Sequence, residues 1–330
     1  MNKKIDFENI PSVIVLKGDS KTAYRDPLLH YHEGIFRLFC SLVILDSTGK
    51  SSFSIVSLQS TDLVSWTQPK AITKTSETNH FCGPGSIIFF KNSWVMCLSS
   101  YPHPNVTEAR CWTMSSNDLD SWSEPQPMRL KGSNIPVKST GRTLDPYIFR
   151  DKDSSQKWWC FYKQGGILIN QAHSLAFGGM TTPPDTLLLQ SLNLCYSYDL
   201  KNWTPYATID GEENYCVIID NNEYVLIDSP GNGIGVRRSR DLVHWYDECL
   251  YTLGQREWPW AHGRLTAAHV LDLRNKAAVG KYLVTFHGAT LKGRISTGFH
   301  GSASIGLAWT DNLIQWSWAG QGKNAANGST

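Results

Sequence analysis

Three acidic residues open apolar segments of the chain and could meet in one pocket. Asp26 and Asp145 each precede a proline and a hydrophobic run, and Glu213 opens a third run of the same kind. Three carboxylates facing one cavity would repel each other and raise each other's pKa, which indicates a chemical purpose. Two carboxyl groups on opposite sides of a sugar can cleave a glycosidic bond, because one protonates the leaving oxygen while the other activates water or attacks the anomeric carbon.

The competing interpretation is structural, since Asp-Pro is a common turn dipeptide. Two Asp-Pro pairs and a glutamate at corresponding points of three segments favour a catalytic set, so we predict that Asp26, Asp145 and Glu213 are catalytic. Glu212 stands beside Glu213, and either could be the proton donor. Only one of two neighbours on a strand faces inward, and strand alignment favours Glu213. A donor working near neutral pH needs a pKa above the usual value of about 4.3, which we expect burial and Asp145 to provide.

A repeated motif predicts the elements that hold these acids. Five times an aspartate, once shifted by one position, precedes a leucine that is followed three residues later by a tryptophan. The tryptophans are Trp66, Trp122, Trp203, Trp245 and Trp316. A mean repeat of about 66 residues (330/5) is too long for a helical solenoid and suits a four-stranded sheet. The chain is therefore predicted to be all-β, a five-bladed β-propeller forming a single domain over residues 1–330.

The motif itself has a structural explanation. Its aspartate can accept hydrogen bonds from amides two or three residues further on, which closes a turn. Its leucine and tryptophan can fill the gap between neighbouring blades. The motif thus reports the fold and not the function.

Composition narrows the possible partners and the compartment. The 31 basic and 29 acidic residues nearly balance, so nothing indicates a nucleic-acid partner. No run of about 18 apolar residues predicts a membrane span. The first residues are charged and lack an apolar signal region, so we expect a cytoplasmic protein, or a secreted or periplasmic one whose signal has been removed. Eight cysteines without a C-x-x-C pair favour buried free thiols and a reducing compartment.

Other residues near strand ends are candidates for holding a sugar. Those predicted to bind substrate are His80, Trp258, Trp260, Arg264 and His287. Arg264 could bond sugar hydroxyls or a carboxylate. Trp258 and Trp260 could stack on sugar rings, or they could plug blade 5 against blade 4. Residues 165–190 exceed an ordinary hairpin loop and are predicted to form a surface loop near one mouth of the propeller.

The order Asp, Asp, Glu, with separations of 119 and 68 residues (145−26, 213−145), resembles glycoside hydrolase family 43. The stretch Leu144–Asp151 carries the resemblance most closely, together with His262-Gly263 and the strand pair ending in His287. That family comprises five-bladed propellers, among them arabinofuranosidases, arabinanases and β-xylosidases, and is related to families 32, 62 and 117. The resemblance implies an inverting glycosidase that acts on an oligosaccharide or glycoside.

The same resemblance implies roles for individual residues. Asp26 would be the general base, Asp145 the residue that tunes and orients, and Glu213 the general acid. No cofactor is required, although many relatives hold a calcium ion near the propeller axis, where the resemblance places His262 as a metal ligand.

This chain also departs from the family pattern. Glu213-Asn214-Tyr215 replaces Glu-Gly-Pro, and Cys82-Gly83-Pro84-Gly85 replaces Trp-Ala-Pro-Asp, which alters a subsite wall. Two alternatives therefore stay open. One is a propeller glycosidase of the family 117 or 32 type, in which a histidine acts as the acid. The other is a carbohydrate-binding propeller without catalysis, against which the three retained acids argue.

Overall fold

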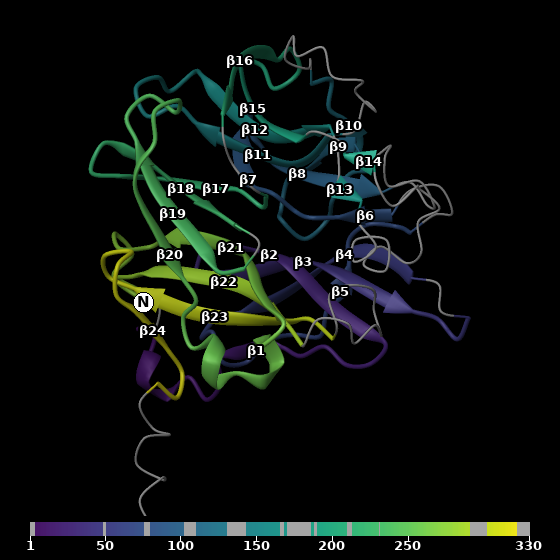
Figure 1. Ribbon diagram of the computed structural model, residues 1–330, viewed down its shortest axis with the longest axis vertical. Coiled ribbons are helices and arrows are strands. Elements are labelled where there is room, and N and C mark those ends of the chain that lie inside the picture. The colour runs from purple at the N-terminus through teal and green to yellow at the C-terminus, as the bar shows by residue number, and fades with distance from the viewer. Residues whose placement is uncertain are drawn as a thin grey trace, which may run out of the picture.

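Five antiparallel sheets follow one another around a common centre in the computed structural model (Figure 1), so the predicted five-bladed β-propeller is confirmed. The structure describes residues 4–48, 51–75, 80–101, 110–130, 143–165, 168–169, 186–187, 190–209, 213–230, 232–290 and 302–321. Among these residues, no helix has the length and apolar character needed to span a membrane.

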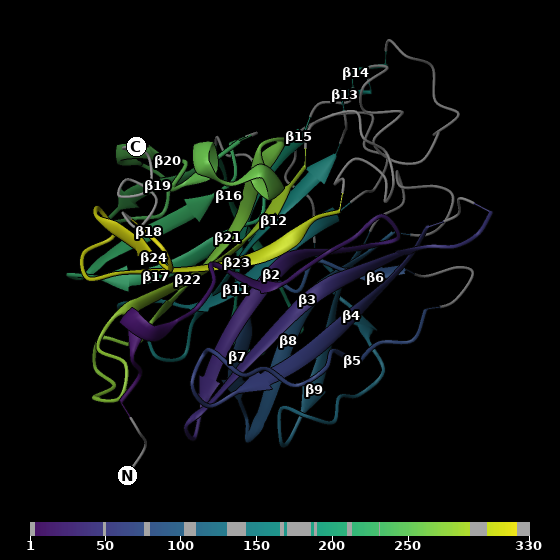
Figure 2. The same ribbon diagram turned by 90° about the horizontal axis from the view of Figure 1, so that it is seen from below.

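The first three blades follow the order of the chain. Blade 1 contains β2 (Thr22–His32), β3 (Ile35–Leu45), β4 (Ser51–Ser60) and β5 (Lys70–Ala71). Figure 2 shows β3, β4 and β5 side by side as one twisted sheet. Blade 2 contains β6 (His80–Cys82), β7 (Ile87–Phe90), β8 (Ser93–Tyr101), β9 (Arg110–Ser116) and β10 (Gln126–Pro127). Blade 3 contains β11 (Thr143–Arg150), β12 (Trp158–Gly165), β15 (Gln190–Ser197) and β16 (Thr204–Ile209).

Blades 4 and 5 complete the ring. Blade 4 contains β17 (Cys216–Asp220), β18 (Glu223–Asp228), β19 (Ile234–Ser239) and β20 (Tyr246–Tyr251). Blade 5 contains β21 (Arg264–Asp272), β22 (Tyr282–Ala289), β23 (Ser304–Thr310) and β24 (Trp316–Trp318). The N-terminal strand β1 (Ile14–Leu16) also belongs to blade 5, because it pairs with β23. The described residues also form the short 3-10 helices η1 (Phe7–Asn9), η3 (Gln255–Glu257) and η4 (Pro259–Ala261).

Two short strands lie within the predicted surface loop at residues 165–190. Strands β13 (Leu168–Ile169) and β14 (Thr186–Leu187) pair antiparallel within it. Most of the remaining loop lies outside the described residues, so its predicted place near one mouth stays a prediction.

Each repeated motif forms the turn expected from its sequence. In blade 1, Asp62 Oδ1 accepts the N–H groups of Val64 and Ser65 at 2.8 and 2.7 Å. Leu63 adopts a positive φ of 63° and is buried, and Trp66 Nε1 donates to its carbonyl at 3.2 Å. Equivalent turns close the other four blades, with Asn312 in the aspartate's place in blade 5. The motif therefore sets the outer turn of every blade.

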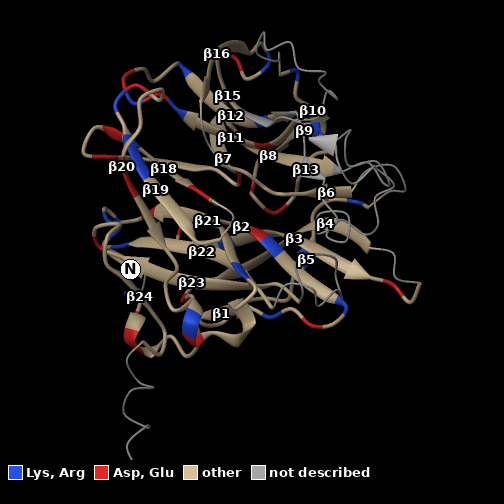
Figure 3. Cartoon of the chain, in the orientation of Figure 1, with Lys and Arg blue, Asp and Glu red and all other residues tan. Residues whose placement is uncertain are grey.

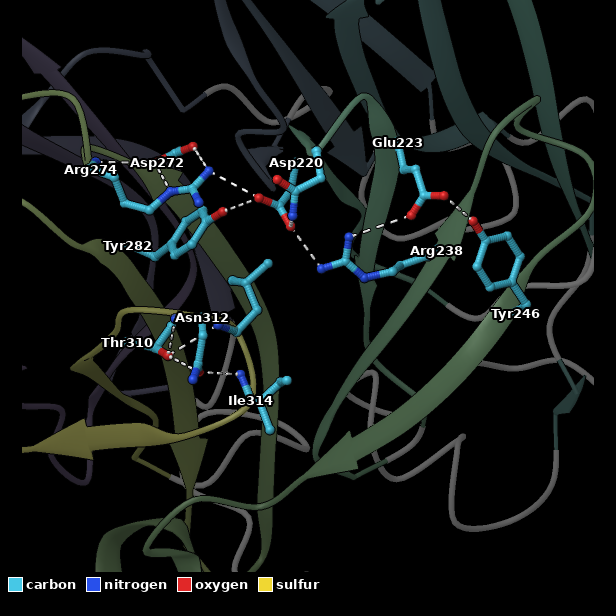
Figure 4. A network of polar contacts seen from close by, with 12 residues as sticks. Asp220, Glu223, Arg238, Tyr246, Asp272, Arg274, Tyr282, Thr310, Asn312 and Ile314 are labelled. Carbon is cyan, nitrogen blue, oxygen red and sulfur yellow. Dashed lines mark hydrogen bonds and ion pairs between the residues drawn. The ribbon is translucent and has the colours of Figure 1, made fainter.

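A buried carboxylate joins blades 4 and 5 at the end of β17. Asp220 accepts hydrogen bonds from Arg238 of blade 4 at 2.8 Å and from Tyr282 of blade 5 at 2.8 Å. Arg274, which follows β21, lies 3.0 Å away. Figure 4 shows Asp220 between Arg238 on one side and Arg274 with Tyr282 on the other. Burial raises the pKa of Asp220, but these donors outweigh it and hold the pKa below its usual value.

Replacing Asp220 by asparagine is expected to destabilise the fold by about 3 kcal/mol at pH 7, because two arginines lose a buried carboxylate partner. A carboxylate with a lowered folded pKa stabilises above its unfolded pKa, and that contribution disappears as the pH falls through the folded pKa. Urea unfolding should therefore show a large difference between parent and variant at pH 7 that shrinks towards pH 2. Asp153→Asn, at an exposed acid, is the control. A difference independent of pH would contradict the ionic role.

Candidate active site

Each blade has a residue with a positive φ in or close to its innermost strand. These residues, here called the blade heads, have φ angles of 49° at Asp26, 55° at Gly83, 52° at Asp145, 55° at Asn214 and 53° at Ala267. The register of three blades shifts at this point, which marks a β-bulge. Positive φ strains residues other than glycine, and such strain concentrates at functional sites. The blade heads therefore form a strained ring around the axis, and two of them carry carboxylates.

Glu213 lies one residue before the position that the sequence predicted for it. The blade head of blade 4 is Asn214, and Glu213 precedes it. The Glu213 carbonyl accepts the Ser229 N–H at 3.0 Å, so Glu213 occupies the place of Arg25 in blade 1. The expected equivalence of Glu213 with Asp26 and Asp145 is thus wrong by one residue. Blade 4 has no Asp-Pro pair at this point, so its sequence does not show which residue is the blade head.

Side chains on the second strands connect the blade heads into a ring. Each of four such side chains accepts the N–H of the next blade's head: Ser41 from Gly83 at 2.7 Å, Ser99 from Asp145 at 3.0 Å, Ser229 from Ala267 at 2.7 Å, and His287 Nδ1 from Asp26 at 3.1 Å. Lys163 is the equivalent residue of blade 3, because it pairs with Leu144 as Ser41 pairs with Arg25.

The predicted acids Asp26 and Asp145 line the same pocket, together with Gly83, Asn214 and His269. Asp26 is 11% exposed, and its carboxylate accepts a hydrogen bond from Ser41 at 2.9 Å. The Arg25 guanidinium and the His287 ring each lie 3.8 Å from that carboxylate. Blades 1 and 5 therefore hold Asp26 in a fixed place at the pocket wall.

Glu213 reaches the same region from blade 4 and is held by two cations. Lys163 Nζ donates to Glu213 at 2.8 Å and lies 3.4 Å from Asp145, while Arg264 donates to the other Glu213 oxygen at 2.6 Å. Burial raises the pKa of Glu213, but Lys163 and Arg264 outweigh it and hold the pKa far below the usual 4.5. The expectation of a raised pKa is wrong, because a cation lies between Glu213 and Asp145. Glu212 lies outside the described residues.

Two histidines belong to the pocket region, and His262 is not one of them. His287 is 1% exposed, and burial with the nearby Arg25 and Arg264 holds its pKa well below the usual value. His269 lines the pocket, and burial lowers its pKa to about 4. His262 lies between the end of η4 and the start of β21 and is exposed. Its Nε2 lies 3.2 Å from the Arg256 carbonyl oxygen.

The predicted metal role of His262 is therefore not supported. Calcium prefers six to eight oxygen ligands, whereas the imidazole that lines the pocket, His269, offers nitrogen. Within the described part of the chain, no group of three histidine, cysteine or acidic side chains could hold a metal ion.

Three residues predicted to bind substrate serve the core instead. Trp258 is 7% exposed and stacks on Phe286 and Trp260 at ring-centre distances of 5.7 and 5.5 Å. Trp260 covers Gly288, where an added Cβ would lie 2.4 Å from the indole. His80 is 3% exposed and is not part of the pocket lining. Both tryptophans pack in the core on Phe286 of blade 5, whereas the packing interpretation placed them between blades 5 and 4. Arg264 and His287 are the predicted binding residues that reach the acids.

Sequence reasoning missed Lys163, Arg25 and Ser41. Arg25 adjoins the predicted base, so proximity alone could have indicated it. Lys163 is the single charged residue in the run Trp158-Trp159-Cys160-Phe161-Tyr162-Lys163-Gln164, and it is only 5% exposed. A lysine that directly follows an apolar run could have indicated a buried charge with acidic partners. Ser41 carried no signal of its own.

No protein-family model matches this chain, and no curated protein matches it either. Solved structures do match it. A thermostable family 43 glycoside hydrolase shares 14% identity at a TM-score of 0.58, with 92% of each chain covered. A β-xylosidase/α-arabinofuranosidase from a compost metagenome, solved with xylotriose, shares 11% identity at 0.60, covering 94% of this chain and 98% of that one.

A third match is a family 117 glycoside hydrolase of the marine bacterium Zobellia galactanivorans, with 14% identity, a TM-score of 0.61 and coverage of 92% and 88%. This chain has the fold of the family 43 and family 117 glycoside hydrolases. The fold expected from the resemblance is therefore confirmed. Figure 3 shows Lys and Arg (blue) and Asp and Glu (red) at scattered places along a mostly tan ribbon.

Proposed function

We propose that the chain is a glycoside hydrolase that cleaves its substrate with inversion at the anomeric carbon. The observation that carries the proposal is the meeting of three acids from blades 1, 3 and 4. Asp26 and Asp145 line one pocket, and Lys163 contacts both Asp145 and Glu213. The fold neighbours support the proposal, since several are glycoside hydrolases.

In this mechanism Asp26 is the general base and Glu213 the general acid. A water attacks the anomeric carbon and gives its proton to the Asp26 carboxylate, while the bond from that carbon to the leaving oxygen breaks. Glu213 gives its proton to the leaving oxygen. Its side chain is 31% exposed, against 11% for Asp26 and 13% for Asp145, so a sugar can reach it. Asp145 orients Glu213 through Lys163.

The pH dependence of this acid follows from its contacts. Glu213 must carry a proton to act, yet Lys163 and Arg264 favour its ionised form. We therefore expect kcat/KM to rise as the pH falls from 8 towards 4, because the fraction of protonated Glu213 increases. Initial rates on an aryl glycoside across this range, with stability checked at each pH, measure it. A profile with its maximum above pH 7 would contradict Glu213 as the acid.

The proposed substrates are α-L-arabinofuranosides or β-D-xylosides. A neighbour named as a β-xylosidase/α-arabinofuranosidase supports this choice. A panel of aryl α-L-arabinofuranoside, β-D-xyloside, β-D-galactoside and β-fructoside tests it, with hydrolysis of one of the first two expected. Binding of xylotriose without hydrolysis of any member would identify a carbohydrate-binding propeller instead.

A second candidate is a glycosidase with a histidine as its acid. His287 favours it, because its ring lies 3.8 Å from the Asp26 carboxylate and the charge of Glu213 acts to raise the pKa of that ring. The His287 side chain is only 1% exposed, whereas that of Glu213 is 31% exposed and open to a sugar, so Glu213 remains the first choice. We also propose a reducing compartment such as the cytoplasm, supported by eight free cysteines, seven of them buried.

A further inference from the structure

Lys163 breaks the pattern of the ring that connects the blade heads. At the equivalent position, blades 1, 2 and 4 carry serine and blade 5 carries histidine, and each accepts the N–H of the next blade's head. A short hydroxyl therefore satisfies the fold at this place in three blades. Blade 3 has a lysine instead, whose long side chain reaches past the backbone to two carboxylates. The fold alone does not require this residue.

The geometry of Lys163 is that of a clamp between two acids. Its ammonium lies 2.8 Å from Glu213 and 3.4 Å from Asp145, and the side chain is 5% exposed. Burying a lysine is unfavourable unless opposite charges surround it. The two acids supply those charges, and the ammonium turns the repulsion between neighbouring carboxylates into attraction. Each member therefore holds the other two in place.

We propose that Lys163 is a positioning residue of the active site, which clamps Glu213 to Asp145 and fixes the direction from which Glu213 meets the leaving oxygen. The proposal rests on the glycosidase function proposed above. It deepens that function, because it makes the reaction depend on Lys163 as well as on the three acids. Lys163 contacts the carboxylates of Glu213 and Asp145 and acts on the reaction through Glu213.

The groups that face Glu213 come from blades 3 and 5. Lys163 of β12 and Arg264 of β21 contact it directly, His287 of β22 senses its charge, and Asp145 of β11 acts across the Lys163 ammonium. Removing Lys163 leaves Arg264 as the one cation among these groups in contact with Glu213, and it exposes Glu213 to the charge of Asp145. Both changes favour the protonated form of Glu213.

Lys163→Ser is the decisive variant, because serine already serves this position in three other blades. We expect the alkaline limb of kcat/KM to move to higher pH by about one unit or more. We also expect the limiting kcat at acid pH to fall by about 10- to 100-fold, because Glu213 loses its fixed direction. Lys163→Arg, which keeps a cation, should restore part of kcat and return the limb towards that of the parent.

Lys157→Ser is the matched control, since it removes a lysine of the same blade whose ammonium stacks on Trp159 at 3.7 Å. It should change the melting temperature without moving the pH profile. A purely structural Lys163 would behave in the same way. A folded Lys163→Ser protein whose pH profile and limiting kcat match those of the parent would overturn the proposal.

A readout without substrate separates this proposal from the proposed function. Carbon-13 NMR of labelled glutamate carboxyls, with the Glu213 signal assigned by its loss in Glu213→Gln, follows the ionisation of Glu213 directly. The Glu213 midpoint should rise by about one pH unit or more in Lys163→Ser. An unchanged midpoint overturns the clamp whatever the activity. If the midpoint rises while the parent protein hydrolyses no glycoside, the clamp stands and the glycosidase function fails.

Discussion

Replacing Asp26 by asparagine is expected to lower kcat by about 10²- to 10⁴-fold, because the attacking water loses its general base. The amide is nearly the same size as the carboxylate, and its oxygen can still accept the Ser41 hydroxyl that now donates to Asp26 at 2.9 Å. Substrate binding should therefore change little, and the loss should fall on kcat and not on KM. Steady-state kinetics on the best aryl glycoside measure both constants.

Asp311→Asn is the control for this variant, since Asp311 is 70% exposed and pairs with Lys281 at the surface. It should keep full activity. The stereochemistry of the parent reaction gives a second check, because a base that activates water yields the inverted anomer. Proton NMR of the first product formed should show inversion. Full activity in Asp26→Asn, or net retention in the parent, would remove Asp26 from the role of base.

Replacing Glu213 by glutamine should produce a loss that depends on the leaving group. Substrates with poor leaving groups, such as xylo-oligosaccharides, should lose about 10²- to 10⁴-fold in kcat/KM because their oxygen needs a proton. Activated aryl glycosides should retain most of their rate, since their phenolate leaves without protonation. The alkaline limb of the pH profile should also disappear, because the titrating acid is gone. Rates on both substrate types at several pH values measure these effects.

Glu248→Gln is the matched control, since Glu248 lies on the exposed strand β20, and it should leave both rates unchanged. Equal losses on both substrate types would mean that Glu213 positions the substrate or the other acids and donates no proton. His287 would then be the next residue to replace, because it is the histidine beside Asp26.

The sequence predicted the fold well because the fold repeats. One turn, built by an aspartate (asparagine in blade 5), a leucine and a tryptophan, recurs in every blade, so five weak local signals agree with each other. Asp26 and Asp145 could be found for the same reason, since both blade heads precede a proline. The sequence identifies Glu213 as an acid of the site but predicts its position wrongly by one residue, because the blade head of blade 4 is Asn214.

The electrostatics of the site could not be predicted from the same pattern. The pKa of Glu213 depends on Lys163 and Arg264, which lie 50 and 51 residues away in the chain. Nothing local in the sequence says which strand positions face which, because a bulge in each of three blades shifts the register. The sequence also placed His262 at a strand head, whereas β21 begins at Arg264 and His269 of that strand lines the pocket. The sequence alone permits two roles for Trp258, and its stacking on Phe286 favours packing.

The pairing of β1 with β23 has a consequence for how the molecule forms. The first strand of the chain completes the last blade, and Gly18 and Ser304 meet across a separation of 286 residues. Contacts between such distant segments are slow to form, because a long loop must close before any contact is gained. During synthesis, blades 1 to 4 can emerge before the partner of β1 exists. Blades 1, 3, 4 and 5 all supply residues around Asp26 and Glu213, so catalytic competence should be the last property acquired in folding.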